Sequence, residues 1–149
     1  MKVVVQRVHQ ASVDIDGRVV GKIGRGLLLL IGVAETDSES DAEYMADKCV
    51  HLRVFQDEQG KMNRSVLEEN GQILAISQFT LLADTSRGRR PSFIAAAGPE
   101  KGERLYVYFI DCIRNFNLHV ETGIFGAMMD VHLVNAGPVT VILDSKSNL

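Results

Sequence analysis

Apolar and polar residues alternate along the first part of the chain with the period of two that is typical of a half-buried strand. This pattern predicts strands at Lys2–Val8, Ala11–Ile15 and Arg18–Ile23, with a turn at Asp16-Gly17 before the third. The segment Leu27–Val33 is apolar almost throughout, as expected for a strand that is buried on both faces. The chain therefore begins as a meander of strands with one central, buried member.

Two later segments change to the period of 3.6 residues that is typical of a helix buried on one side. Ser38 and Asp41 resemble a capping box at the start of the first helix, and Pro99 suits the first turn of the second, which should run to Phe116. The apolar positions at helical spacing are Ala42, Met45, Ala46, Cys49 and Val50, and then Leu105, Tyr108, Phe109, Cys112, Ile113 and Phe116. Each stripe predicts that its helix covers a sheet.

The rest of the chain reads as strands and turns. We expect strands at Leu52–Phe55, Gln72–Leu82, Met129–Asn135 and Val139–Leu143, a turn at Asp57–Gly60, and a break at Ala136-Gly137-Pro138. No repeat or linker divides the 149 residues, which suit a single domain. We therefore predict one domain of the α/β class, with mixed and antiparallel sheets, both helices on one face and further strands behind, in three layers α/β/β.

The composition is that of an ordinary globular protein, with 46% hydrophobic residues, 23% charged residues and a formal net charge of −3. This balance excludes a disordered tail, a collagen and a histone-like nucleic-acid coat. The longest aliphatic run, Leu27 to Ile31, is far shorter than the roughly 20 residues of a membrane helix. The first residues lack the apolar centre of a signal peptide. We expect a cytoplasmic protein without a membrane partner.

Cysteine and histidine give no sign of a metal or cofactor. Cys49 and Cys112 both fall on apolar helix faces and form no C-x-x-C pair, so we expect buried free thiols. The four histidines are scattered and have no acidic partner at ligand spacing. We predict neither a bound metal nor a cofactor.

Two polar segments interrupt apolar strands and are candidates for chemistry. Ser77-Gln78-Phe79-Thr80 follows an apolar strand run, and such residues at a strand end either line a pocket or simply face water. Asn135-Ala136-Gly137-Pro138-Val139-Thr140 lies between two apolar strands, where a Gly-Pro pair commonly marks only a reversal of direction. The residue spacing alone leaves both alternatives open.

Together these segments resemble the D-aminoacyl-tRNA deacylase family. Ser77 to Leu81 matches the family's S-Q-F-T-L motif, and Asn135 to Thr140 matches its N-x-G-P-x-T motif. The similarity also covers Gln6-Arg7-Val8, Leu52-Arg53-Val54-Phe55, Gly88-Arg89-Arg90-Pro91-Ser92-Phe93 and Thr122-Gly123-Ile124-Phe125-Gly126-Ala127. Both motifs, in order and in a chain of this length, make the resemblance specific.

The resemblance implies a homodimer that hydrolyses the ester between a D-amino acid and the terminal adenosine of tRNA. It assigns one wall of the active site to Ser77, Gln78, Phe79 and Thr80. It assigns a chiral filter, with a cis peptide bond, to Gly137 and Pro138 of the motif that begins at Asn135, and this turn enters the active site of the other subunit. Arg7 and Met129 would brace the filter. Ala136, Met128 and Asp130 depart from the commoner family residues, which affects the role of Met129 most.

The chemistry of an activated ester adds expectations about mechanism. Hydrolysis needs a positioned attacking oxygen and oxyanion donors more than a strong base, and the backbone N–H groups near Phe79 and Thr80 are candidate donors. Thr80 acts either as nucleophile or as orienting group. Because no His, Lys or acid lies between Ser77 and Leu82, we favour orientation, with attack by a water that the adenosine 2′-hydroxyl helps to position. A backbone filter should also accept glycine, so glycyl-tRNA is a predicted substrate.

Arginines supply the expected contact with RNA despite the acidic net charge. Arg87, Arg89 and Arg90 follow the polar strand end closely, and such a cluster either binds tRNA phosphates or serves only as a solvated surface. Two other functions stay open from the sequence. One is a small-molecule esterase or amidase with a Thr or Ser nucleophile, and the other is a tRNA-binding module that ignores the acyl group.

Overall fold

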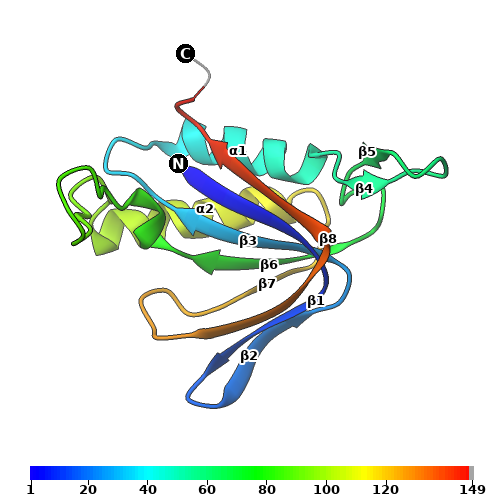
Figure 1. The fold of residues 1–149 in the computed structure, drawn as a ribbon, viewed down its shortest axis with the longest axis horizontal. Helices are drawn as coiled ribbons and strands as arrows, with labels where there is room; N and C mark the ends of the chain where they lie inside the picture. Colours follow the sequence, from blue (N-terminus) through cyan, green and yellow to red (C-terminus); the bar gives the residue numbers. More distant parts are fainter. Residues whose placement is uncertain (148–149) are drawn as a thin grey trace.

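The computed structural model describes residues 1–147 and consists of a six-stranded mixed sheet, a separate two-stranded hairpin and two helices (Figure 1). In chain order the elements are β1 (Lys2–Ile15), β2 (Arg18–Ile23), β3 (Gly26–Gly32), α1 (Glu39–His51), β4 (Phe55–Gln56), β5 (Met62–Arg64), β6 (Gln72–Ser77), the 3-10 helix η1 (Phe79–Leu82), α2 (Pro99–Arg114), β7 (Val120–Thr122) and β8 (Asp130–Asp144). Strand β1 pairs antiparallel with β2, β3 and β8, whereas β6 runs parallel to β3 and β7.

Helices α1 and α2 pack against each other on one face of the sheet (Figure 1). The capping box expected at Ser38 and Asp41 is present, because the Ser38 amide donates to Asp41 Oδ2 at 2.9 Å. The main core lies between the helices and the sheet, and its fully buried members include Val3, Val5, Leu27, Leu29, Met45, Phe55, Phe109 and Ile113. This layer confirms that the predicted apolar stripes of both helices cover a sheet.

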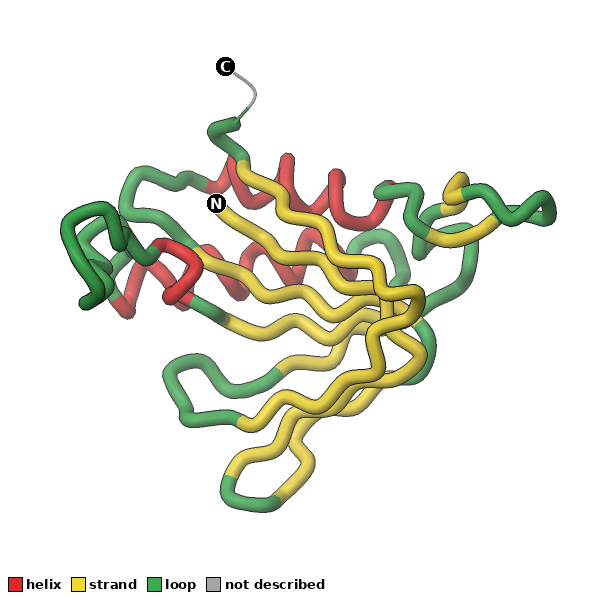
Figure 2. The backbone as a smooth tube through the Cα atoms, viewed as in Figure 1, coloured by secondary structure: helices red, strands yellow, loops and turns green. Residues whose placement is uncertain are grey.

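A second core lies on the opposite face of the sheet. Strands β1 and β8 are long enough to bend together, and their far halves, with β2, fold back over β3 and β6 (Figure 2). The buried residues enclosed there are Val8, Ala11, Val13, Ile23, Leu28, Leu74 and Ile76. The predicted α/β/β arrangement of three layers is therefore confirmed.

Several element boundaries differ from the sequence prediction. The strand expected over Gln72–Leu82 ends at Ser77, and the chain then turns into η1. The two strands expected after the second helix form one continuous strand, β8, in which the break predicted at Ala136-Gly137-Pro138 is a shift of register. Leu52 to Val54 is a connection rather than a strand. The short strands β5 and β7 were not predicted, because three residues carry too little periodicity.

Both cysteines are free thiols, but they differ in burial. Cys49 is fully buried as predicted, and burial raises the pKa of its thiol to about 12. Cys112 is only half-buried, so its prediction as a buried thiol was wrong in degree. Within residues 1–147, neither helix is both long enough and apolar enough to cross a membrane.

Candidate active site

The first part of the candidate site is the strand-end segment, which we define as Ser77 to Thr80. Strand β6 is buried up to Ile76 and ends at Ser77. The backbone N–H of Gln78 then donates to Ile31 O of β3 at 2.7 Å. This bond fixes the point at which the strand gives way to η1. The leading N–H groups of such a helix have no acceptor within it, so those of Phe79 and Thr80 are available to an incoming oxygen.

In the strand-end segment Phe79 and Thr80 are exposed, whereas Ser77 and Gln78 are half-buried. Phe79 is 56% exposed, and its ring meets that of Phe93 edge to face with 5.1 Å between centroids. The side-chain amide of Gln78 donates from Nε2 to Thr80 Oγ1. Within residues 1–147 this is the only polar side-chain contact of the Thr80 hydroxyl. A carboxamide cannot accept the proton of a threonine nucleophile. The segment therefore offers hydroxyls, an amide and backbone donors but no general base of its own.

An exposed loop carries the three predicted arginines directly after η1. Asp84 and Ser92 pair at its base, with Ser92 N donating to Asp84 O at 2.9 Å. The Ser86 amide donates to the Asp84 side chain and lowers the pKa of that carboxyl. Arg87, Arg89 and Arg90 are exposed, and none forms an ion pair within the part of the chain that the structure describes. Their charges are thus available to a partner.

The second part of the candidate site is the Gly-Pro turn, which we define as Ala136-Gly137-Pro138. The Gly137–Pro138 peptide bond is cis, as the resemblance implied, and Gly137 has a φ of +125° that residues with side chains rarely adopt. Ala136 is buried, whereas Gly137 and Pro138 are exposed. The turn therefore presents backbone rather than side chains to its surroundings.

Arg7 and Asn135 hold the Gly-Pro turn. Arg7 Nε donates to Ala136 O at 3.0 Å, and a Cβ added to Gly137 would lie 2.8 Å from Arg7 Nη2. On the other side, Asn135 Oδ1 accepts from the Val139 amide at 3.0 Å, while its Nδ2 donates to Thr140 Oγ1 at 2.9 Å. The turn is therefore fixed by side chains from both β1 and β8.

The two parts of the site lie far apart on the sheet of one chain, the first where β6 ends and the second in the middle of β8. Ser77 is in register with Ile31, and through β1 this row continues to Leu143, five residues beyond Pro138 on β8. With strand spacings near 4.8 Å and a rise near 3.3 Å per residue, the two parts are about 20 Å apart. One chain alone does not bring the strand-end segment and its own Gly-Pro turn together.

Met129 belongs to the end of the sheet that carries the strand-end segment. Met129 packs against the second core. Its sulfur and Ile76 Cδ1 both lie beside Gly123, because a Cβ added there would contact both atoms, and Ile76 directly precedes Ser77. Asp130, its neighbour, pairs with Asp14, seven residues along β1 from Arg7. Within one chain Met129 therefore lies away from the Gly-Pro turn, and its role as a brace of the filter stays a prediction.

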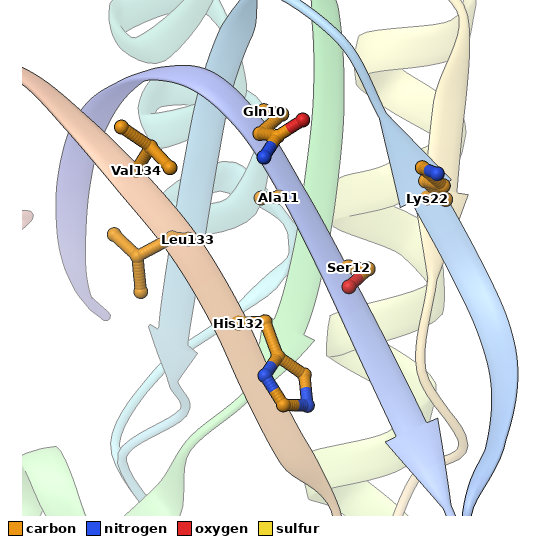
Figure 3. A pocket seen from close by; sticks show the side chains of 7 residues that line it. All are labelled: Gln10, Ala11, Ser12, Lys22, His132, Leu133 and Val134. Carbon is orange, nitrogen blue, oxygen red and sulfur yellow. The ribbon is translucent and has the colours of Figure 1, made fainter.

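A shallow hollow on the surface coincides with neither part. This pocket of about 210 Å³ lies on the outer face of β1, β2 and β8 (Figure 3). Its lining residues are Gln10, Ala11, Ser12, Lys22, His132, Leu133 and Val134, and none belongs to the predicted site. Both parts of the candidate site are open surfaces instead.

The sequence did not predict one group that holds Arg7 beside the Gly-Pro turn. Arg7 Nη1 donates to the backbone carbonyl of Val54 at 2.7 Å, in the connection between α1 and β4. A carbonyl group leaves no signature in the residue type. The only available signal was the segment Leu52 to Phe55, which contributed to the resemblance but had no assigned role.

Comparisons with known sequences show the family of the chain. A family model described as D-Tyr-tRNA(Tyr) deacylase matches residues 4–144. A D-aminoacyl-tRNA deacylase of Bacillus cytotoxicus is 58% identical over 146 residues, covering 98% of this chain and 100% of the relative. A protein of the same name from Thermosipho melanesiensis is 56% identical over 147 residues, covering 98% of each chain.

Solved structures share the fold. A structure described as c-Myc DNA unwinding element binding protein has a TM-score of 0.91 and 41% identity, and the match covers 97% of this chain and 98% of that one. A probable eukaryotic D-amino acid tRNA deacylase has a TM-score of 0.81 at 18% identity over 95% of this chain and 97% of its own, which shows similarity of fold alone. From the family model and the full-length relatives, the chain belongs to the D-Tyr-tRNA(Tyr) deacylase family.

Proposed function

We propose that this enzyme hydrolyses the ester that joins a D-amino acid, or glycine, to the 3′-terminal adenosine of tRNA, and that it rejects L-aminoacyl-tRNA. The observation that carries the proposal is that one chain presents both an open strand end with donor groups and, elsewhere on the sheet, an exposed backbone turn held by Arg7 and Asn135. The cytoplasm, where aminoacyl-tRNA is used, is the proposed place of action.

We propose further that the active enzyme is a homodimer in which the Gly-Pro turn of each subunit meets the strand-end segment of its partner. The separation of about 20 Å within one chain supports this arrangement, since strand rise and spacing fix that distance. An isologous two-fold contact would bring together two such sites at once. Each site is then incomplete without the second copy.

An apolar row supports a contact on the sheet face away from the helices. Val4 pairs with Leu30 on β3 and with Ile142 on β8, so the three side chains lie in one row across the sheet. Val3, Val5 and Val141 point to the helices instead, and Ile142 is 74% exposed. Val4 and Leu30 are half-buried, so Ile142 is the exposed apolar side chain of this row, and its exposure favours burial against another protein surface.

The proposed reaction requires few groups. A water oxygen attacks the ester carbonyl carbon, the backbone N–H groups of Phe79 and Thr80 stabilise the oxyanion, and the bond to the ribose oxygen breaks. One proton of the attacking water ends on the leaving ribose oxygen, and the other passes to solvent as the amino acid departs as a carboxylate. Thr80, which receives a hydrogen bond from Gln78, orients the ester or the water and forms no bond to the acyl group.

Selection by chirality is assigned to the shape of the Gly-Pro turn. A backbone element close to the substrate Cα excludes a side chain of L configuration but leaves a D side chain pointing outward. Because Gly137 has no Cβ, the backbone can approach closely, and Arg7 keeps it in place. Asn135 fixes the other end of the turn. Glycine has no side chain to exclude and passes the same filter.

The arginine loop is proposed as the tRNA contact. Arg87, Arg89 and Arg90 lie in the loop that follows η1, and their unpaired charges suit the phosphates of the acceptor end. Phosphate contacts of this kind position the RNA without reading its sequence. The same surface would serve many tRNAs.

One experiment separates the proposal from its two alternatives. Purified protein is incubated with D-aminoacyl-tRNA, L-aminoacyl-tRNA, glycyl-tRNA and a simple D-amino acid ester, and release of the amino acid is followed. The proposal expects rapid release from D-aminoacyl-tRNA and glycyl-tRNA, with the L form left intact. Hydrolysis of the simple ester at the same rate would support a small-molecule esterase, and binding of all tRNAs without release would support a binding module.

A further inference from the structure

The guanidinium of Arg7 bridges two backbone carbonyls that are distant in sequence. Nε donates to Ala136 O at 3.0 Å and Nη1 donates to Val54 O at 2.7 Å. No carboxylate pairs with Arg7 within residues 1–147. The position of this side chain is therefore decided by two fixed carbonyls and not by a mobile acidic side chain.

The Val54 carbonyl is held by the main core. Val54 is 5% exposed and Phe55 is fully buried, and both belong to the core between the sheet and the helices. Arg25, paired with Glu69 at 2.7 Å, lies over the Phe55 ring at 5.4 Å from its centroid. The connection from α1 to β4 thus has a defined position, and its carbonyl is a fixed point against which Arg7 is aligned.

The Gly-Pro turn lies on the other side of the same guanidinium. Arg7 Nη2 is so close to Gly137 that a Cβ there would lie 2.8 Å from it. A shift of the guanidinium toward or away from Val54 therefore changes the contact between Arg7 and Gly137 and with it the position of the turn. Hydrogen bonds from a charged donor are stronger than neutral ones, so the loss of one changes the alignment measurably.

We propose that the segment Leu52–Phe55 is the positioning element of the chiral filter, acting through the Val54 carbonyl and Arg7. It touches no substrate, and its effect is on discrimination between D and L substrates rather than on the chemistry of the ester. This assignment rests on the proposed function of the Gly-Pro turn. It gives a role to a segment that would otherwise be only part of the core.

A pair of matched core variants tests the proposal. Phe55 and Phe109 are both fully buried phenylalanines of the same core, but only Phe55 adjoins the Val54 carbonyl. Phe55→Leu should raise the ratio of L to D hydrolysis about tenfold, the effect of one weakened charged hydrogen bond. Phe109→Leu should lower thermal stability comparably and leave the ratio unchanged. Equal ratios in the two variants would overturn the proposal.

The dependence on Arg7 gives a second, independent readout. In an Arg7→Ala background, Phe55→Leu should cause no further change in the L to D ratio, because the pathway from the core to the turn is already cut. An additional change of the same size would contradict transmission through Arg7. If Phe55→Leu fails to fold, replacing the Val54–Phe55 amide with an ester weakens the same acceptor without altering a side chain, and it should raise the ratio in the same way.

Failure of this inference is distinguishable from failure of the proposed function. Wild-type protein that leaves D-aminoacyl-tRNA intact would refute the function. Wild-type protein that hydrolyses it, together with an unchanged ratio in Phe55→Leu, would refute the positioning role alone.

Discussion

The Gly-Pro turn and the strand-end segment are both exposed interruptions of apolar strands, but they are held in opposite ways. In the turn, side chains of Arg7 and Asn135 fix the backbone, and the backbone faces outward. In the strand-end segment, the Ile31 carbonyl fixes the backbone at Gln78, while the side chains of Phe79 and Thr80 are exposed. In the proposed function the turn therefore acts by its shape and the strand-end segment by the groups it presents, so substitutions in the two regions should affect activity and selectivity differently.

The largest effect is expected from a side chain in the turn. Gly137→Ala adds a Cβ next to Arg7 Nη2 at a φ of +125°, so the turn must move. We expect hydrolysis of D-aminoacyl-tRNA and glycyl-tRNA to fall at least about 100-fold, as for other small displacements near a reacting group. Gly17→Ala, at a φ of +76° with open space around it, is the control and should retain activity. Parental rates in Gly137→Ala would exclude a filter at this turn.

Loosening the turn should change selectivity more than rate. Arg7→Ala removes the hydrogen bonds to Ala136 O and Val54 O but leaves Gly137 unchanged. We expect L-aminoacyl-tRNA hydrolysis to rise about tenfold while D hydrolysis falls only slightly. Single-turnover assays with L-aminoacyl-tRNA and D-aminoacyl-tRNA measure the two rates of hydrolysis. A loss of both activities without any gain on the L substrate would indicate that Arg7 supports the fold rather than the filter.

A substitution in the strand-end segment should affect rate without changing selectivity. Thr80→Ala removes a hydroxyl whose only side-chain partner within residues 1–147 is Gln78. We expect about a fivefold fall in turnover, as for the loss of one neutral hydrogen bond. Thr36→Ala, another exposed threonine, serves as the control. Complete loss of activity together with an acyl-threonine adduct in mass spectrometry would mean that Thr80 is the nucleophile.

The arginine loop should influence binding only. Arg89→Ala should raise the KM for D-aminoacyl-tRNA about threefold at physiological salt and lower the slope of log affinity against log salt by about one. Arg18→Ala, on β2, should change neither quantity. An unchanged salt dependence in Arg89→Ala would identify the cluster as a solvated surface.

The smallest effect on activity is expected from a site remote from both regions. Burial alone would raise the pKa of Asp41, but hydrogen bonds from Lys146 and the Ser38 amide outweigh it and hold that pKa well below its usual range. The charged carboxylate therefore stabilises the fold above its unfolded pKa of about 4, and this contribution is lost as the pH falls further. Asp41→Asn should cost about 1 kcal/mol of unfolding free energy at pH 7, and less at pH 3.

Urea denaturation at the two pH values measures the difference, with Glu103→Gln on α2 as the control. Activity of Asp41→Asn on D-aminoacyl-tRNA should match the wild type. An equal loss of stability at pH 7 and pH 3 would contradict the role given to the charged form of Asp41.

The sequence predicted those parts of the fold that depend on local periodicity. Both helices and the buried strand β3 have strong patterns, and the S-Q-F-T-L and N-x-G-P-x-T motifs indicated both parts of the candidate site. The end of β6 at Ser77 was not predictable, because Phe79 to Leu82 is as apolar as a strand, and only the fold shows that these residues turn into η1. The role of the Val54 carbonyl as an acceptor for Arg7 was not predictable for a different reason, because backbone groups carry no residue-specific signal.

In the proposed dimer one chain's strand-end segment and its partner's Gly-Pro turn form a single site, and mixed dimers show whether they do. Gly137→Ala disables only the turn, and Thr80→Arg fills only the exposed strand-end segment, so each homodimer should be inactive. After the two variants are unfolded together and refolded, half of the dimers should be hybrids, and each hybrid should contain one intact site. The account predicts recovery of about a quarter of wild-type activity on D-aminoacyl-tRNA. A mixture no more active than the two variants alone would contradict it.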